Sequence, residues 1–247
     1  MKEALARVLS RQHPDNVGEI TADEYRSARR FLGEFGGNLY TVSYDLLLYW
    51  TLLQELEPEI ESDDGFRSDP DDEDAEWVTW DGYAGHKQRV FYLHGGLHLY
   101  DAGSSLKKIT WVRTGNPLVD QIREALDSGT YPLVVTEGSS SDKLTLIEHS
   151  PYLHRGLKSL TSCGGSLFVH GHSLAANDDH VLRRIEEGKV AAVFVSLHGD
   201  PTAAPNEALR HRAELLVERR HEPKPTRRRR PLELTFYDAE SAQVWGS

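Results

Sequence analysis

The order of apolar and polar positions near the start of the chain predicts a helix, a strand and a second helix. The first helix, over residues 21–35, opens with a capping box in which Glu24 reaches back to the amide of Thr21. A short strand over residues 38–42 follows. Residues 45–56 are strongly apolar at helical spacing, which predicts the second helix.

The rest of the chain reads as strands separated mainly by helices. We predict strands over residues 89–93, 97–100, 108–112, 132–136, 166–169, 190–197 and 232–237, and helices over residues 116–129, 139–149, 150–160, 177–188 and 207–220. Apolar strands separated by single helices indicate a mainly parallel sheet with helices on both faces. The predicted fold is therefore a single α/β domain over residues 1–247.

Composition and charge narrow the functional class. A chain of 247 residues with 38% hydrophobic and 27% charged residues suits a globular protein. No stretch reaches the roughly 18 apolar residues of a membrane span, and the first residues lack the apolar run of a secretory signal. The net charge of −11 disfavours nucleic-acid and membrane partners, and a single cysteine, Cys163, fits a reducing compartment. We therefore expect a cytoplasmic protein.

Two segments depart from the average charge. Residues 63–76 hold eight acids and one arginine, which predicts an exposed acidic loop. Residues 221–230 are basic and contain two prolines, which predicts a solvated linker before the last strand. A nucleic-acid contact is the alternative for this linker, but no aromatic residues interleave its arginines. The linker is also able to pair electrostatically with the acidic loop.

Unusual polar residues follow several predicted strands. In open α/β sheets, ligands bind at the carboxyl ends of the strands, where glycines let the backbone approach them. We therefore predict one ligand pocket centred on His94 and formed by five turns: Ser43-Tyr44-Asp45, His94-Gly95-Gly96, Thr136-Glu137-Gly138-Ser139, Gly171-His172-Ser173 and His198-Gly199-Asp200.

Each of these features also has a simpler interpretation. Asp45 is equally suited to cap the helix that follows it, and His94 to be a hydrogen-bonded core histidine. Residues 177–179 suit a helix cap with acids in the first turn. The twelve histidines also invite comparison with a two-metal phosphoesterase, but the early Asp-x-His and the Gly-Asn-His-Glu/Asp elements of that class are missing. A nucleotide site is favoured over a metal site.

Three ordered motifs resemble the bacterial sirtuin-like domains, whose fold is Rossmann-like. They are Tyr40-Thr41-Val42-Ser43-Tyr44-Asp45-Leu46-Leu47, Leu93-His94-Gly95, and Gly171-His172-Ser173-Leu174 followed by Asp178-Asp179-His180. The longer strings over residues 44–50, 92–101 and 171–180 are closer still to the uncharacterised bacterial family called domain of unknown function 4917, and this similarity runs from about residue 30 to residue 245.

The resemblance implies an NAD-binding protein, and one that hydrolyses NAD to release nicotinamide in defence against phage. His94 would contact the ribose hydroxyls and act as the base, and Asp45 would fix the turn beneath the ribose. Ser43 stands where the family pattern commonly has the asparagine that orients the attacking water. The resemblance places the remaining nucleotide contacts at Gly95, Gly171, His172, Ser173, Asp178 and Asp179.

Sirtuin-like domains also begin with a strand and a glycine-rich turn that cradles the pyrophosphate, whereas the segment before Tyr40 is predicted to be helical. Three hypotheses follow: an NAD glycohydrolase, a catalytically silent nucleotide-binding or regulatory module, and a metal-dependent phosphoesterase. Because sirtuin-like effectors are often kept quiet by assembly, the resemblance also implies a homo-oligomer or a protein partner encoded by an adjacent gene.

Overall fold

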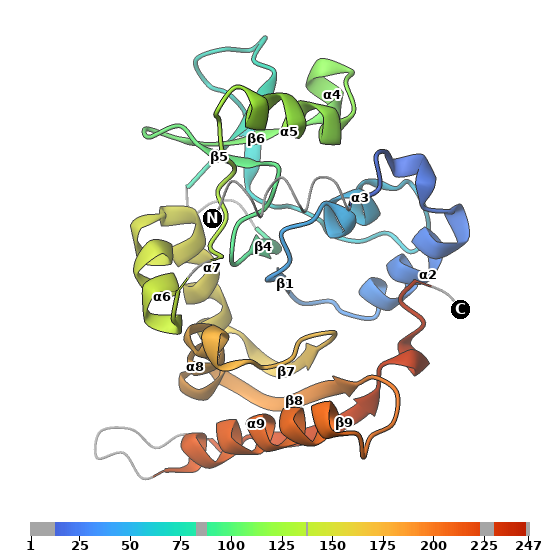
Figure 1. The fold of residues 1–247 in the computed structure, drawn as a ribbon, viewed down its shortest axis with the longest axis vertical. Coiled ribbons are helices and arrows are strands. Elements are labelled where there is room, and N and C mark those ends of the chain that lie inside the picture. The colour runs from blue at the N-terminus through green and yellow to red at the C-terminus, as the bar shows by residue number, and fades with distance from the viewer. Residues whose placement is uncertain (1–12, 83–87, 137, 223–229, 246–247) are drawn as a thin grey trace. The chain divides into compact units, whose positions relative to one another are not determined.

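The computed structural model describes residues 13–82, 88–136, 138–222 and 230–245 (Figure 1). The chain divides into two compact units. Unit 1 comprises Met1–Glu137, Leu146–Gly156 and Val244–Ser247, and unit 2 comprises Gly138–Thr145 and Leu157–Gln243. Two of the boundaries fall within helices, one in α6 (Ser140–His149) and one in α7 (Pro151–Ser162). Each unit is described by itself below.

The first helices of unit 1 follow the sequence prediction. After the short η1 (Val17–Glu19), α2 (Ala22–Gly33) begins at the predicted capping box: the Thr21 hydroxyl accepts from the Glu24 amide, and Glu24 accepts from the Thr21 amide at 2.7 Å. Helix α3 (Leu47–Leu53) is shorter than predicted. Arg29, which is 4% exposed, donates to backbone carbonyls at and beyond the end of this helix, those of Thr51, Leu52, Leu56 and Pro58. These bonds satisfy carbonyls that the helix itself leaves without partners.

Two short parallel strands, β1 (Leu39–Thr41) and β4 (Val90–Tyr92), form the sheet that carries the first candidate site. Every residue of β4 is buried, as a strand covered on both faces requires. A parallel pair aligns its carboxyl ends at one edge of the sheet. The turns that follow Thr41 and Tyr92 therefore leave the sheet side by side.

Unit 1 also contains a four-stranded antiparallel sheet in the order β2-β3-β6-β5. Its strands are β2 (Phe66–Ser68), β3 (Trp77–Trp80), β6 (Leu106–Ile109) and β5 (Leu99–Asp101). The prediction of an acidic loop over residues 63–76 was wrong in its first half. Phe66 is buried and pairs with Trp80, and Asp64 forms an ion pair with the buried Lys108, which compensates its charge.

Two predicted strands of unit 1 differ in the structure. The strand over residues 108–112 ends at Ile109, and the next residues form α4 (Trp111–Thr114), ahead of α5 (Leu118–Asp127). The strand over residues 132–136 is only an isolated bridge between Gly95 and Val134. The Leu133 amide donates to the Leu99 carbonyl, and the Leu133 carbonyl accepts from the Gly96 amide. The segment therefore bonds to two different neighbours and forms a continuous ladder with neither.

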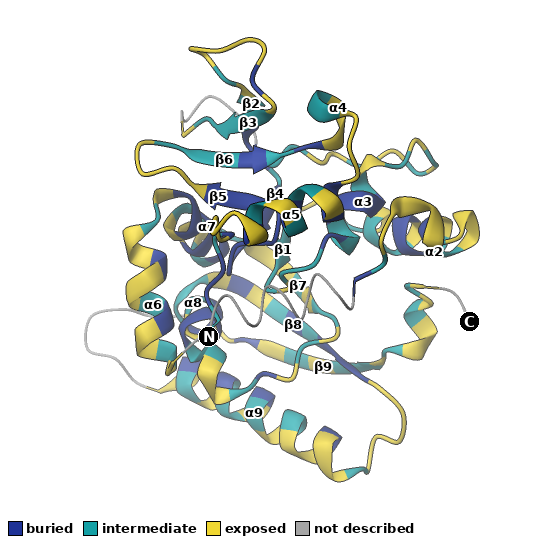
Figure 2. Cartoon of the chain, turned by 45° about the horizontal axis from the view of Figure 1, so that its top comes forward, coloured by how far each residue is buried: buried dark blue, intermediate teal, exposed yellow. Residues whose placement is uncertain are grey.

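Unit 2 is built on a three-stranded parallel sheet in the order β7-β8-β9. Its strands are β7 (Gly164–Val169), β8 (Lys189–Leu197) and β9 (Glu233–Asp238). The connections contain η2 (Ala176–Asp178), α8 (Asp179–Glu187) and α9 (Ala204–His221), and η3 (Glu240–Ala242) follows β9. Helix α9 exposes one side along its length, whereas much of β8 is buried (Figure 2).

The predicted α/β class is confirmed, but the strands are distributed differently. Among the described residues they form three small sheets, two parallel and one antiparallel. In the part of the chain that the structure describes, no helix is both long enough and apolar enough to cross a membrane. The basic linker over residues 221–230 lies mostly outside the described residues.

Candidate functional site

In unit 1, the turns after β1 and β4 are joined by backbone hydrogen bonds. The Leu93 amide donates to the Thr41 carbonyl at 2.8 Å, and the Leu97 amide donates to the Tyr44 carbonyl at 2.9 Å. The rings of Tyr44 and His94 stack with their centroids 6.2 Å apart. Within unit 1 the structure therefore brings His94 next to the Ser43-Tyr44-Asp45 segment.

The His94-Gly95-Gly96 turn is held by backbone geometry. Gly95 has a φ of +79°, and a Cβ on this residue would lie 1.9 Å from the Leu133 carbonyl oxygen. The Gly96 amide donates to the same carbonyl at 3.0 Å, and the Val135 amide donates to the His94 carbonyl at 2.9 Å. Only glycine fits this close approach at Gly95. The backbone thereby fixes the direction of His94, which is 2% exposed.

Ser43 and Asp45 bond to each other and to the start of α3. The Ser43 hydroxyl donates to one carboxylate oxygen of Asp45, and the other oxygen accepts from the Leu47 amide at 2.9 Å. This second bond satisfies a donor in the first turn of the helix. The contacts of Asp45 are therefore those of a residue that caps a helix. The Ser43 hydroxyl donates its hydrogen to Asp45.

In unit 2, the Gly171-His172-Ser173-Leu174 turn follows the carboxyl end of β7. Leu174 adopts a φ of +52°, unusual for a residue other than glycine, and its amide donates to Nδ1 of His172 at 2.9 Å. Because Nδ1 accepts this bond, the neutral ring carries its hydrogen on Nε2. Gly171 donates to the Ser196 hydroxyl at 3.0 Å, and Ser173 is exposed.

Asp178 connects this turn to α6 through a largely buried chain of polar groups. One oxygen accepts from Nζ of Lys143 at 2.8 Å, and the other lies 3.3 Å from Nε2 of His172. The side chains of Lys143 and Asp178 are only 4% and 14% exposed. The carboxylate therefore orients the His172 ring while Lys143 balances the charge of Asp178.

His180 forms a second polar pair in unit 2. Its amide donates to the Ser140 hydroxyl at 2.6 Å, and Nδ1 lies 3.2 Å from the same oxygen. Burial lowers the pKa of His180 to about 4, against the opposing attraction of the nearby Asp178. The imidazole is therefore neutral at neutral pH.

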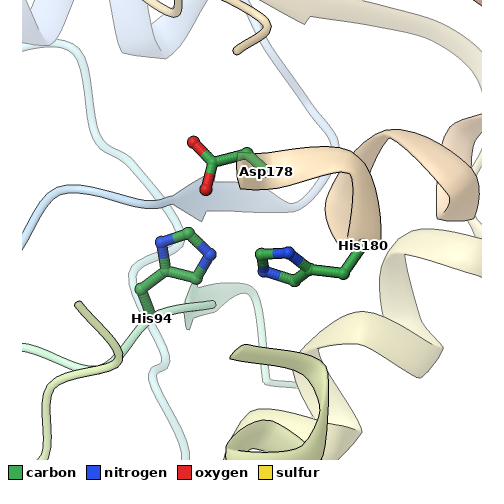
Figure 3. Close-up of side chains that lie close together, drawn as sticks. All are labelled: His94, Asp178 and His180. Atoms are coloured by element: carbon green, nitrogen blue, oxygen red, sulfur yellow. The ribbon is translucent and has the colours of Figure 1, made fainter. Parts of the chain in front are cut away.

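Figure 3 draws Asp178 and His180, which come from the start of α8, together with His94 of unit 1. The Asp178 carboxylate and a ring nitrogen of His180 lie within 4.8 Å of each other. These two groups provide two potential metal ligands within unit 2, whereas catalytic zinc sites use three protein ligands.

The remaining predicted site residues have mainly structural contacts. Asp179 forms an ion pair with Arg212, whose Nε also donates to the Leu174 carbonyl at 2.9 Å, so Asp179 supports the turn indirectly. The prediction that Asn177 caps a helix was wrong, because Asn177 lies inside η2 and the residue before α8 is Asp178. His198 is exposed, and Asp200 accepts from the amide and hydroxyl of Thr202.

Sequence reasoning missed Lys143 and Ser140. Both belong to α6, whose sequence looks like that of an ordinary polar surface helix. The sequence contained one hint of their role: the helix that carries them was predicted to begin near Ser139, shortly after the end of a predicted strand. His180 was included in a motif, but its pairing with Ser140 was not predicted, because the two residues lie 40 positions apart.

A family profile described as Domain of unknown function (DUF4917) matches residues 1–245. The chain belongs to this family. No curated protein and no solved structure matches the chain. For this DUF4917 protein, functional inference therefore depends on the polar groups described above.

Proposed function

We propose that this DUF4917 protein binds NAD and hydrolyses the bond between nicotinamide and ribose. The observation that carries the proposal is the alignment of β1 and β4, which puts His94 beside the Ser43-Tyr44-Asp45 segment at the carboxyl end of a parallel pair. A buried histidine on a rigid turn suits a residue that must hold one orientation during proton transfer.

Unit 2 supplies a second strand-end feature. Gly171 and Ser173 are exposed at the carboxyl end of β7. The glycine backbone and the serine hydroxyl suit contacts to ribose or phosphate oxygens. Asp178 and Lys143 keep His172 in one tautomer in this turn. Asp178 and Asp179 hold this turn, through Lys143 and Arg212 respectively.

The proposed reaction adds one water across the glycosidic bond. The bond between C1′ and the ring nitrogen breaks, and nicotinamide leaves with the electron pair, which neutralises its ring. The water oxygen bonds to C1′ and gives one proton to His94, which passes it to solvent, so the products are ADP-ribose, nicotinamide and a proton. The protein contributes orientation of the ribose, exclusion of other nucleophiles and a base for the water.

Purified protein incubated with NAD, followed by chromatography, tests the proposal. We expect release of nicotinamide and ADP-ribose, and a fall of about 100-fold or more in His94→Ala, since one acid–base residue contributes about that factor. His211→Ala, at an exposed histidine of α9, is the matched control and should keep the rate. An unchanged rate in a folded His94→Ala or His94→Gln variant contradicts the mechanism.

The same preparation distinguishes the alternatives. Calorimetry that detects NAD or ADP-ribose binding without turnover favours a silent nucleotide-binding module. Stoichiometric metal in the purified protein, with phosphoesterase activity that a chelator removes, favours the metal-dependent enzyme. The resemblance to sirtuin-like domains implies a role in defence against phage. Cells that carry His94→Ala should then lose the protection from phage that the parent protein gives.

A further inference from the structure

The acidic turn between β2 and β3 lies beside exposed apolar residues at one end of the antiparallel sheet of unit 1. The register of β3 and β6 sets Trp77 opposite Ile109, so the chain leaving β6 passes the turn that enters β3. Trp111 and Val112 then follow in α4, with 60% and 79% of their surface exposed. The turn itself is exposed along most of its length (Figure 2).

Several contacts fix the shape of this surface. Arg113 of α4 donates through Nη1 to the Glu73 carbonyl at 2.8 Å and through Nη2 to the Ser68 hydroxyl. Asp69 accepts from Nε1 of Trp77 at 3.2 Å and from the Thr79 hydroxyl at 2.7 Å. These bonds lower the pKa of Asp69 and join the turn to the sheet. The guanidinium of Arg113 bonds a carbonyl and a hydroxyl, and it forms no ion pair with a carboxylate among the described residues.

The turn carries a concentrated negative charge. Five exposed acids have no ion pair with any residue that the structure describes: Asp71, Asp72, Glu73, Asp74 and Glu76. Like charges this close repel one another, and a cationic partner would relieve that repulsion. We call these five acids together with Trp111 and Val112 the acidic–apolar surface.

We propose that the acidic–apolar surface binds an extended basic segment of a partner protein, in which arginines or lysines alternate with apolar side chains. The negative sign excludes nucleic acid and anionic lipid as occupants. Exposed tryptophan beside a charged rim is typical of the residues that dominate protein–protein binding energy. The cations of the segment pair with the turn, and its apolar side chains cover Trp111 and Val112.

Fluorescence anisotropy of the full chain with a labelled synthetic peptide that alternates arginine and leucine tests this inference. Two control peptides replace every arginine by glutamine or every leucine by serine. We expect the parent peptide to bind and both controls to bind about tenfold or more weakly, because charge and apolar contact are both required. If the peptide without leucine binds as tightly as the parent peptide, nonspecific charge attraction explains the binding and the proposal is overturned.

Matched variants locate the contact. Trp111→Ser with Val112→Ser, and separately Asp71→Asn with Asp72→Asn and Asp74→Asn, should each weaken binding about tenfold. The controls should bind as the parent protein does: Leu53→Ser, which is 53% exposed, and the neutralised exposed set Glu55→Gln, Glu57→Gln and Glu59→Gln. Controls that weaken binding as much as the variants overturn the assignment. Self-association of the unliganded protein that the Trp111 and Val112 changes abolish also overturns it, because a second copy is then the occupant.

Discussion

The two strand-end turns, residues 94–96 of unit 1 and residues 171–174 of unit 2, are held in place by different forces. Backbone bonds and the close approach of Gly95 to the Leu133 carbonyl hold the first turn. Charged side chains hold the second turn: Asp178 with Lys143, and Arg212, which bonds the Leu174 carbonyl. The comparison teaches that a histidine can be oriented by backbone contacts or by charged side chains, in both cases with partners from distant positions in the sequence. The two turns should therefore respond to different perturbations.

Removal of the Lys143 charge is expected to have the largest effect on stability. Lys143→Met keeps an apolar stem but leaves the Asp178 carboxylate, 14% exposed, without its cation. Breaking a buried pair from one side costs about 3–5 kcal/mol in the free energy of unfolding, which urea denaturation measures. The matched control Arg26→Met, at an exposed pair with Asp23, should cost about 0.5 kcal/mol or less.

A second variant tests the cause of the Lys143 effect. If the uncompensated carboxylate is responsible, adding Asp178→Asn to Lys143→Met should recover part of the lost stability. A further loss in the double variant would mean that packing of the lysine stem, rather than charge, supports the turn.

Alanine at the two turn glycines is expected to have the next largest effect, and it separates the turns. Gly95→Ala should cost about 3 kcal/mol, because the new Cβ meets a backbone oxygen in addition to the positive φ. Gly171→Ala should cost about 1 kcal/mol, because its φ of +66° is strained but no atom lies within 4 Å of the added Cβ. Equal losses in urea titrations would contradict the steric explanation.

Acidification is expected to produce a smaller effect than Lys143→Met or Gly95→Ala. The pKa of His180 falls from 6.5 to about 4 on folding, so the unfolded chain binds a proton that the folded chain does not. This contribution to stability is complete above pH 6.5 and is lost as the pH falls through the window from 6.5 to 4. Between pH 7 and pH 5 the loss is about 2 kcal/mol.

Burial also lowers the pKa of His98, whose ring nitrogens have no hydrogen-bond partner among the described residues, so unit 1 should lose stability in the same direction. Urea titrations at several pH values should show that the free energy of unfolding depends less steeply on pH in His180→Gln than in the parent protein. An identical pH dependence in His180→Gln would show that other groups bind the proton.

Local sequence patterns predicted the start of one helix and the course of one strand correctly. The capping box at Thr21 predicted the start of α2, and the apolar run of β4 predicted a strand buried throughout. The strand predicted over residues 132–136 was wrong, because Leu133 divides its bonds between Leu99 and Gly96. The loop predicted at Asp64 was wrong in part, because a buried lysine from 44 positions away offsets its charge.

By itself the sequence determined the α/β class and the presence of glycine-containing turns after the apolar strands, since capping, periodicity and glycine placement act over a few residues. Only the tertiary structure decided that Lys143 neutralises Asp178 and that Ser140 bonds His180. The physical reason is that the protonation state and orientation of a buried polar group depend on whichever charges and donors surround it. Folding brings those groups from distant positions, and no local pattern in the sequence records them.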